Sequence, residues 1–338
     1  MSTVGKAAPA AVVRGIGAYV PPKVVTNDDL AEYLDTSDEW VRSRTGIVQR
    51  HVAAPDVSTV DLSTEAAARA LKSAGGGDAD AVLVATTTPD RLCPATAPEV
   101  ASRLGLTNVA AFDVGAVCTG FIYALAAGSG LIAAGIAERV VVVGAEAIHR
   151  FLNPADRSTS VIFGDGAGAL VLGAGEADEP GALGPFDLGS DGENADLIAV
   201  NAGGSRLPAS WADIERSLHF LQMDGREVYR HAIPRMVSSC QRVLAAAGWT
   251  VADVDRLVGH QANVRILHGV ADRLGVPASK SVVNIERYGN TAAASVPLAL
   301  ADPAPVGLLP GHRVLLTAFG GGLTWGSTVL TWPTLSVT

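Results

Sequence analysis

One cysteine of this chain, Cys118, lies where a strand-like apolar run gives way to a helix-like one. The run VAAFDV (109–114) precedes it and the small-residue run TGFIYALAAGSGLIAAG (119–135) follows it, which predicts the thiol in the first turn of a buried helix. The N–H groups and partial positive charge of a helix N-terminus stabilise a thiolate relative to a thiol. The position therefore suits a nucleophile. A buried cysteine taken alone is more often a small core residue, as we predict for Cys240.

A thiolate that attacks an acyl group needs hydrogen-bond donors for the developing oxyanion and a partner for proton or charge handling. His260 follows the apolar run DRLVG, and Asn290 follows VVNIE. The glycine turn 320–322, in AFGGGLTWGS, can bring bare backbone close to a ligand. Each feature alone is typical of a helix cap or a turn. Because all of them follow predicted strands of the second half, together they indicate a catalytic site.

The segment FGDGAGAL (163–170) could be taken for a dinucleotide-binding loop. Such a fingerprint opens a helix after a strand, whereas the strand-like run ALVLGAG follows here. We therefore predict a tight turn between strands.

Composition limits which other classes of protein this chain can belong to. The chain has 338 residues, 48% of them hydrophobic, and a net charge of −9, which predicts two domains or one large one and argues against nucleic-acid binding. The long apolar region 121–143 contains glycines and the pair Glu138-Arg139, so a buried helix and strand are predicted rather than a membrane span. Three widely spaced cysteines form no disulfide framework or metal cluster, which indicates a reduced, cytoplasmic setting.

Buried-strand runs alternate with helical runs, which predicts an α/β fold with covered sheets. Strands are expected at 81–88, 109–114, 139–145, 168–175, 254–260, 280–285, 313–320 and 327–333, and helices at 61–75, 97–105, 224–248, 262–275 and 291–301. In each half a strand and a polar turn lead into a small-residue helix, with Cys118 in one turn and Asn290 in the other. This pattern predicts two duplicated halves, 1–178 and 179–338, joined by a Gly/Pro-rich stretch at 173–185 and followed by a polar insertion near 190–217.

Six motifs resemble the β-ketoacyl-acyl-carrier-protein synthase III family of the thiolase fold, in family order from about residue 13 to 330. They are DTSDEWVRSRTGI, AVCTGF, DRSTSVIFGDGAGA, GHQANVRI, RYGNTAAASVPLAL and AFGGGLTWGS. The resemblance implies a five-layered αβαβα fold with two similar halves, and a homodimer.

The resemblance also implies the site residues and the reaction. Cys118 is the acyl-accepting nucleophile, and His260 and Asn290 serve the condensation. The backbone N–H groups of Cys118 and Gly321 form the oxyanion hole. Coenzyme A contacts are expected at Trp40, Arg44, Arg157, Asn263 and Arg265. The acyl group passes from acyl-CoA to Cys118, malonyl-carrier protein loses CO₂, and the resulting enolate attacks the acyl-cysteine. No metal or redox cofactor and no membrane partner are expected.

This sequence departs from the family pattern at several positions. Cys93 stands where an aromatic commonly reaches the partner's acyl pocket, and Val117 replaces a smaller residue beside the nucleophile. Prolines in ALADPAPVGLLPG (299–311) should end the preceding helix early. Arg230, Arg265 and Arg273 are candidates for docking an acidic carrier protein, weakened by Asp272. Some loops resemble starter-unit synthases of antibiotic pathways.

Other functions on this pattern are an acyltransferase or thioesterase using the Cys-bound acyl group, a thiolase, and a non-catalytic acyl-CoA-binding protein. Asn290 favours carbon–carbon bond formation over an acyltransferase or thioesterase reaction, because its amide suits the stabilisation of an enolate. The glycine turn has no second cysteine, which disfavours a thiolase. Joint presence of Cys118, His260 and Asn290 disfavours a mere binding protein. The sequence does not identify the starter acyl group, the cognate carrier protein or the pathway.

Overall fold

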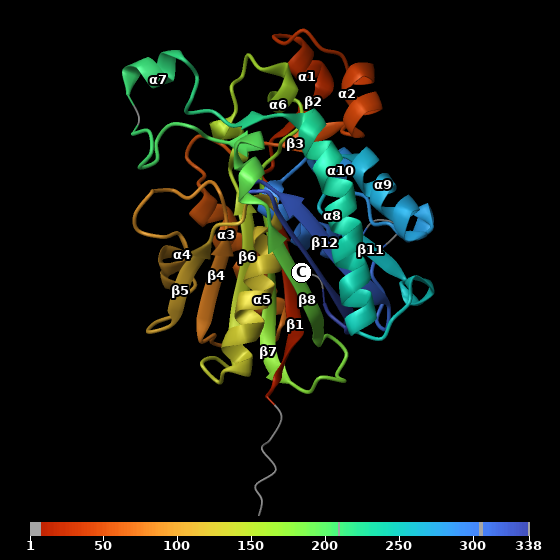
Figure 1. The fold of residues 1–338 in the computed structure, drawn as a ribbon. Helices are drawn as coiled ribbons and strands as arrows, with labels where there is room; N and C mark the ends of the chain where they lie inside the picture. The colour runs from red at the N-terminus through yellow and green to blue at the C-terminus, as the bar shows by residue number, and fades with distance from the viewer. Residues whose placement is uncertain (1–7, 209, 304–306, 337–338) are drawn as a thin grey trace, which may run out of the picture.

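Two β-sheets form the frame of the molecule (Figure 1). The computed structural model describes residues 8–208, 210–303 and 307–336. The first sheet contains, in spatial order, β1 (Ala10–Tyr19), β7 (Gly166–Gly175), β6 (Arg139–Glu146), β4 (Ala81–Ala85) and β5 (Ala110–Val114). The second contains β11 (Arg256–Gly259), β12 (Arg313–Gly320), β13 (Thr324–Thr331) and β8 (Leu183–Ser190). Strand β4 runs parallel to β5 and β6, and β11 runs parallel to β12, so carboxyl ends of neighbouring strands meet at one edge of each sheet.

Helices cover both faces of each sheet. The outer face of the first sheet carries α3 (Thr59–Ser73) and α4 (Ala97–Arg103), and the outer face of the second carries α8 (Gly225–Ala246), against which α9 (Val264–Leu274) packs. Between the sheets lie α5 (Gly120–Ala133) and α11 (Ser295–Leu300), each in contact with strands of both. The layers are therefore helix, sheet, helix, sheet, helix, and the predicted αβαβα fold is confirmed.

Three apolar clusters fill the spaces between these layers, one between the sheets and one beneath each outer helical layer. The chain passes from the first sheet to the second between Gly175 and Leu183, and the predicted boundary at 178/179 falls in this connection. None of the described helices is both long and apolar enough to cross a bilayer.

Two insertions lie over the same end of the molecule, at the top of Figure 1. The first consists of β2 (Val24–Thr26), α1 (Asn27–Ala31), α2 (Asp38–Thr45) and β3 (Gln49–His51). The second, within the predicted polar stretch and just beyond it, contains η3 (Gly192–Leu197), β9 (Ile198–Ala199), α7 (Trp211–Glu215) and β10 (Gln222–Met223). Shorter helices complete the chain: η1 (Val117–Thr119), η2 (Ile148–Phe151), α6 (Arg157–Ser160), η4 (Val251–Asp253), η5 (Ala278–Lys280), α10 (Ile285–Tyr288) and η6 (Ala292–Ala294).

The strand predicted at 280–285 does not form. Its backbone makes a single bridge, from Ser281 to Leu257, and then turns into α10. The side chain of Gln261 takes the place of a neighbouring strand: its Nε2 donates to Val282 O at 3.1 Å and its Oε1 accepts from Asn284 N at 3.0 Å. Polar side-chain bonds of this kind satisfy the backbone without a ladder.

Two more predictions about local structure need correction or completion. The segment 163–170 is not a tight turn between strands, because η2 and α6 separate β6 from β7 and Gly166 already belongs to β7. No helix follows it, so it is also not a dinucleotide loop. The helix before the prolines ends early, at Leu300, as predicted. One of those prolines, Pro305, lies outside the described residues.

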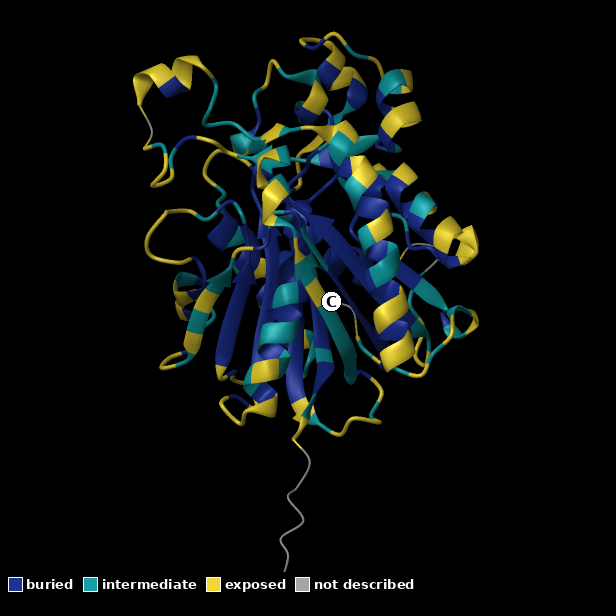
Figure 2. Cartoon of the chain, in the orientation of Figure 1, coloured by how far each residue is buried: buried dark blue, intermediate teal, exposed yellow. Residues whose placement is uncertain are grey.

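The strand β5 was predicted to be buried, and this is wrong. It is the edge of the first sheet, and its residues alternate between exposed and partly exposed, whereas every residue of neighbouring β4 is buried (Figure 2). An apolar run identifies a strand but does not show whether the strand has neighbours on both sides. Phe112 at its centre is 38% exposed.

Candidate active site

Cys118 lies in a tight turn that joins β5 to α5. The turn is the short 3₁₀ segment η1, and its first residue, Val117, has a φ of 49°, a left-handed conformation that a β-branched residue rarely adopts. Glycines let other segments approach this turn: a Cβ on Gly320 would lie 2.8 Å from Cys118 N, and one on Gly120 would lie 3.1 Å from Ala85 Cβ. The glycine turn after β12 therefore packs directly on the backbone of the nucleophile.

The electrostatics of Cys118 differ from the expectation for a helix start. Burial and, to a smaller extent, the Glu146 carboxylate raise the pKa of its thiol to about 12, and a hydrogen bond from its own backbone N–H offsets only part of this rise. Loss of hydration therefore outweighs the helix N-terminus. At neutral pH the resting residue is a thiol, and it must lose its proton as it attacks.

The imidazole of His260 is held by its neighbours in one orientation. His260 follows β11, and its backbone N–H donates to Thr317 O at 2.8 Å, which extends the β11–β12 pairing. Nδ1 lies 2.5 Å from Ser295 Oγ, which also accepts from Gln261 N at 3.3 Å. Ser295 Oγ has one proton that it can donate to Nδ1, and in that tautomer the proton of the imidazole resides on Nε2. Burial lowers the pKa of His260 to about 3, which keeps the ring neutral.

Asn290 is fixed by both its backbone and its side chain. Its N–H donates to Ile162 O at 2.9 Å, and its carbonyl accepts from Gly164 N at 3.0 Å. Its Oδ1 accepts from Ala292 N at 2.9 Å, in a turn where Ala292 has a φ of 44°. Because the oxygen of the amide is occupied, the NH₂ group is the part available to a ligand. Contrary to expectation, Asn290 follows the short helix α10 rather than a strand.

Cys118, His260 and Asn290 line one cavity of about 270 Å³. The second insertion forms part of its wall through Ile198, Ala199 and Met223. Most other lining side chains are apolar: Val117, Ile148, Phe151, Phe163, Ile198, Ala199, Val200, Leu221, Met223, Val228, Ala232, Met236, Ala262, Ile266, Ala292 and Phe319, with Thr87 and Thr88 adding hydroxyls. A thiol and two neutral donors in an apolar cavity suit acyl transfer through an anionic intermediate.

Sequence comparison places this chain in a known family. A family model described as 3-oxoacyl-[acyl-carrier-protein] synthase III matches residues 112–192, and the model of its C-terminal region matches 244–332. The chain is 59% identical over 96% of its length to a β-ketoacyl-[acyl-carrier-protein] synthase III of Streptomyces coelicolor, covering 98% of that protein. It belongs to the β-ketoacyl-acyl-carrier-protein synthase III family. The predicted family and the predicted enzyme class are thereby confirmed.

Solved structures of this family have the same fold. The synthase III of Pseudomonas aeruginosa PAO1 superimposes with a TM-score of 0.91 at 50% identity, covering 97% of this chain and 99% of that chain. The priming β-ketosynthase of the R1128 polyketide pathway gives 0.89 at 34% identity, covering 99% of this chain and 100% of that chain. The reaction predicted from the sequence, starter condensation with malonyl-carrier protein, is the one these relatives support over an acyltransferase or thioesterase.

Within this synthase III fold, a threonine ties the predicted oxyanion-hole residue to the nucleophile. Thr324 Oγ1 lies 3.2 Å from Ala116 O, 3.0 Å from Thr119 Oγ1 and 3.1 Å from Gly321 O. These contacts join the glycine turn to the turn that carries Cys118. Gly321 is therefore held beside the thiol, and its role in an oxyanion hole stays a prediction.

The five residues predicted to contact coenzyme A lie together in the synthase, although they come from three helices. The guanidinium carbons of Arg44 and Arg157 lie 4.5 and 4.7 Å from the ring centre of Trp40. Asn263 Nδ2 donates to Arg44 O at 3.0 Å, and Arg265 donates to Ser43 O at 2.7 Å. These contacts join α2, α6 and the N-terminus of α9 in one basic and aromatic cluster.

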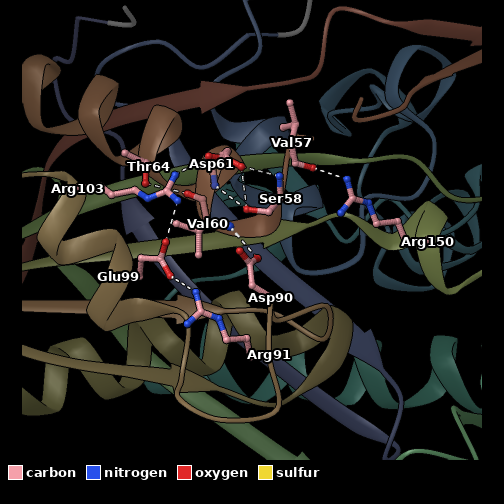
Figure 3. A network of polar contacts seen from close by, with 10 residues as sticks. All are labelled: Val57, Ser58, Val60, Asp61, Thr64, Asp90, Arg91, Glu99, Arg103 and Arg150. Carbon is pink, nitrogen blue, oxygen red and sulfur yellow. Dashed lines mark hydrogen bonds and ion pairs between the residues drawn. The ribbon is translucent and has the colours of Figure 1, made fainter. Parts of the chain in front are cut away.

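Cys93 does not line the cavity of its own chain. It is exposed, on the loop between β4 and α4. Polar contacts hold this loop against the helices (Figure 3): Asp90 Oδ1 accepts from Val60 N at 3.2 Å, and Arg91 pairs with Glu99 at 2.8 Å. Its predicted place in a partner's acyl pocket stays a prediction, whereas Val117 does line the cavity.

The three arginines predicted to dock a carrier protein are exposed. Arg265 and Arg273 lie in the first and last turns of α9, about 12 Å apart at 1.5 Å per residue. Arg230, on α8, is paired with Glu227 at 2.9 Å, which reduces its pull on an acidic partner. Within the described ranges, no group of three or more His, Cys, Asp and Glu residues is arranged to hold a metal ion.

Sequence reasoning missed four residues that support the site. Ser295 contacts His260, Thr324 joins the two turns, and Glu146 bonds from behind the cavity to Thr88, which lines it. A signal existed for Glu146, because an acidic residue directly after the apolar run RVVVVGA is unusual. The others are small hydroxyl residues whose partners are distant in sequence, so no local pattern could reveal them.

Proposed function

We propose that Cys118, His260 and Asn290 carry out both half-reactions of the synthase in the shared cavity. In the first, Cys118 Sγ attacks the thioester carbonyl of acyl-CoA and the C–S bond to CoA breaks. The proton of Cys118 ends on the departing CoA thiol, and the acyl group remains on Sγ. The backbone N–H groups of Cys118 and Gly321 stabilise the oxyanion that forms on the way.

In the second half-reaction, His260 Nε2–H and Asn290 Nδ2 donate to the carbonyl oxygen of the malonyl thioester. The bond between the α-carbon and the carboxylate breaks and CO₂ leaves. The electron pair of that bond stays with the α-carbon and forms an enolate, which the two donors stabilise. The α-carbon attacks the carbonyl carbon of the acyl-cysteine, the bond from that carbon to Sγ breaks, and the Cys118 thiolate takes a proton from solvent. A β-ketoacyl-carrier protein is released.

This proposal rests on the hydrogen bonds that already occupy one polar atom of the His260 ring and one polar atom of the Asn290 amide. Nδ1 of His260 is taken by Ser295 and Oδ1 of Asn290 by Ala292, so both side chains present N–H groups to the cavity. A hydrolase would need His260 to accept a proton from water. A neutral ring with its proton on Nε2 suits an enolate better. The steps need no metal or redox cofactor, and we propose that none is used.

Mass spectrometry of the intact protein with a panel of acyl-CoAs tests the nucleophile. Wild type should gain one acyl mass, and the peptide that carries it should contain Cys118. The matched controls Cys93→Ala and Cys240→Ala should keep the adduct, whereas Cys118→Ala should lose it. An adduct that survives Cys118→Ala would overturn the assignment. The same panel identifies the preferred starter.

The cluster around Trp40 fits the nucleotide end of acyl-CoA, as part of the same proposal. An adenine can stack on the indole, and Arg44, Arg157 and Arg265 can pair with phosphates. Both Arg44 and Arg157 now cover the Trp40 ring, so one guanidinium must move when a base stacks there. Asn263 caps α9 through Arg265 N at 2.8 Å and holds the cluster to that helix.

We also propose a homodimer formed along β5. This strand is an edge with apolar side chains half exposed, and an uncovered edge of this kind promotes association. Leu92, on the adjoining loop, is 89% exposed. Pairing of two such edges would cover these side chains and bring the loop of Cys93 toward a second copy.

A cytoplasmic location fits the three free cysteines. A role in polyketide or antibiotic synthesis stays a proposal supported by the likeness to a priming ketosynthase.

A further inference from the structure

Behind the cavity lies a buried carboxyl group that the mechanism above does not use. Glu146 ends β6 and has no exposed surface. Its Oε1 accepts from Thr87 N at 3.1 Å and from Thr87 Oγ1 at 2.9 Å. Its Oε2 lies 2.7 Å from Thr88 Oγ1 and 3.3 Å from Thr86 Oγ1. Two of these threonines, Thr87 and Thr88, line the cavity.

The same carboxyl group reaches the opposite side of the site. Strand β6 packs against η6, and the backbone N–H of Ala293 in η6 acts on this carboxyl group by lowering its pKa. The preceding residue, Ala292, is the one whose N–H holds Asn290 Oδ1. Glu146 therefore ties the turn that orients the Asn290 amide to the threonine wall of the cavity. A buried carboxyl that accepts hydrogen bonds from four donors of the loop after β4 fixes those donors strongly in place.

Glu146 also acts on the nucleophile by charge. Thr87 and Thr88, which bond to its carboxylate, line the same cavity as Cys118, and η6 packs against both β6 and the Cys118 turn. At this proximity the carboxylate opposes ionisation of the Cys118 thiol. The titratable group that faces it is this thiol, on η1, while the loop after β4 supplies hydroxyls and a backbone N–H and η6 supplies a backbone N–H. Burial, only partly offset by these bonds, raises the pKa of Glu146 to about 7, so its charge changes within the working range of an enzyme.

We propose that Glu146 is a positioning residue of the synthase: its carboxyl group holds the Asn290 turn and the cavity threonines in place, and its charge restrains ionisation of Cys118. The proposal rests on the proposed roles of Cys118 and Asn290. The effect of the length of the Glu146 side chain, its reach, can be separated from the effect of its charge. Glu146→Gln keeps the length of the side chain and removes the charge, and Glu146→Asp keeps the charge and shortens the side chain.

The charge is tested without any acyl transfer, by alkylation of Cys118 with iodoacetamide between pH 5.5 and 9, read on the Cys118 peptide. The rate ratio of Glu146→Gln to wild type should be near one at the acidic end and rise to roughly three- to tenfold at pH 9, the effect of a nearby like charge on a pKa. The control Glu138→Gln removes an exposed carboxylate just before β6 and should match wild type throughout. A ratio independent of pH overturns the charge effect.

Wild type alone provides a second reading should the Gln variant fold poorly. The rate of Cys118 alkylation should rise less than tenfold per pH unit around pH 7, where Glu146 ionises, and a tenfold rise at every step contradicts the proposal. Reach is tested with Glu146→Asp, which should lower kcat for condensation more than the rate of self-acylation. Unchanged condensation in both Glu146 variants overturns the positioning role. Failure of the proposed function itself would instead appear as a wild type that forms no acyl-Cys118.

Discussion

The amide of Asn290 allows a sharp separation of the two half-reactions. Replacing Asn290 with Asp keeps an oxygen to accept from Ala292 N, a bond of 2.9 Å, and so keeps the turn. It removes the NH₂ donor and adds an oxygen in its place. Replacing Asn290 with Ala removes both the donor and the bond to the turn. The pair of variants therefore distinguishes loss of the donor from loss of local structure.

The expected sizes follow from the chemistry of the cavity. Loss of one preorganised donor to an oxyanion costs roughly 10²–10³ in rate, which sets the expectation for Asn290→Ala. The Asp variant should lose more when it is ionised. Two like charges about 4 Å apart repel by about 4 kcal/mol at the effective dielectric of a protein surface, roughly another 10³. Self-acylation should change only a few-fold in Asn290→Asp, because its oxyanion is predicted to form at Cys118 and Gly321.

Two assays report on the half-reactions separately. Rapid quenching and intact-mass measurement give the rate of acyl-Cys118 formation from acyl-CoA. Release of labelled CO₂ from malonyl-carrier protein gives the rate of enolate formation. Thermal unfolding of both variants monitors the turn, and only the Ala variant should lose stability. An equal loss of acylation and decarboxylation in Asn290→Asp would refute the separation and would indicate that Asn290 acts on the thiol instead.

Further predictions concern the pocket, the carrier protein and stability. Cys93→Phe should narrow the starters accepted toward acetyl, and an unchanged acyl-CoA profile would remove Cys93 from the pocket. Arg273→Glu should raise KM for malonyl-carrier protein, with little change in self-acylation, and KM of wild type should rise with salt. The lowered pKa of His260, about 3 against 6.5 unfolded, makes stability fall as pH drops from 6.5. The raised pKa of Glu146, about 7 against 4.5 unfolded, makes stability rise as pH drops from 7. These slopes, about 1.4 kcal/mol per pH unit each, should cancel between pH 6.5 and 4.5, so Glu146→Gln should lose stability on acidification relative to wild type; parallel curves would contradict this.

Much of the fold could be predicted because its signals are local. Continuous apolar runs identify β4, β6, β7 and β12 within a few residues of their observed ends, since doubly covered strands contain little else. Failures arose where a distant partner decided the outcome. The segment 280–285 has the composition of a strand, but the side chain of Gln261 occupies its backbone. Composition likewise gave no indication that β5 is an edge.

For the site, sequence reasoning predicted where Cys118 lies better than it predicted the pKa of its thiol. Cys118 does stand at the start of a buried helix, but the expected preference for thiolate is overturned by burial. A helix terminus lowers the pKa of a thiol only where the charge it favours keeps some hydration. Burial depends on the insertions and on packing between the halves, which no short motif encodes.

The small residues of the middle layer explain how two halves share one cavity. A Cβ on Gly144 would collide with the carbonyl oxygen of Ala293, and one on Gly120 would lie 3.8 Å from Ala293 Cβ. Larger residues there would push η6 away from β6 and α5. That movement would separate the backbone N–H of Ala293 from Glu146 and displace the turn that holds Asn290. Glycine and alanine therefore serve here to bring the Asn290 turn within reach of a substrate on Cys118, at the cost in helix stability that glycine carries.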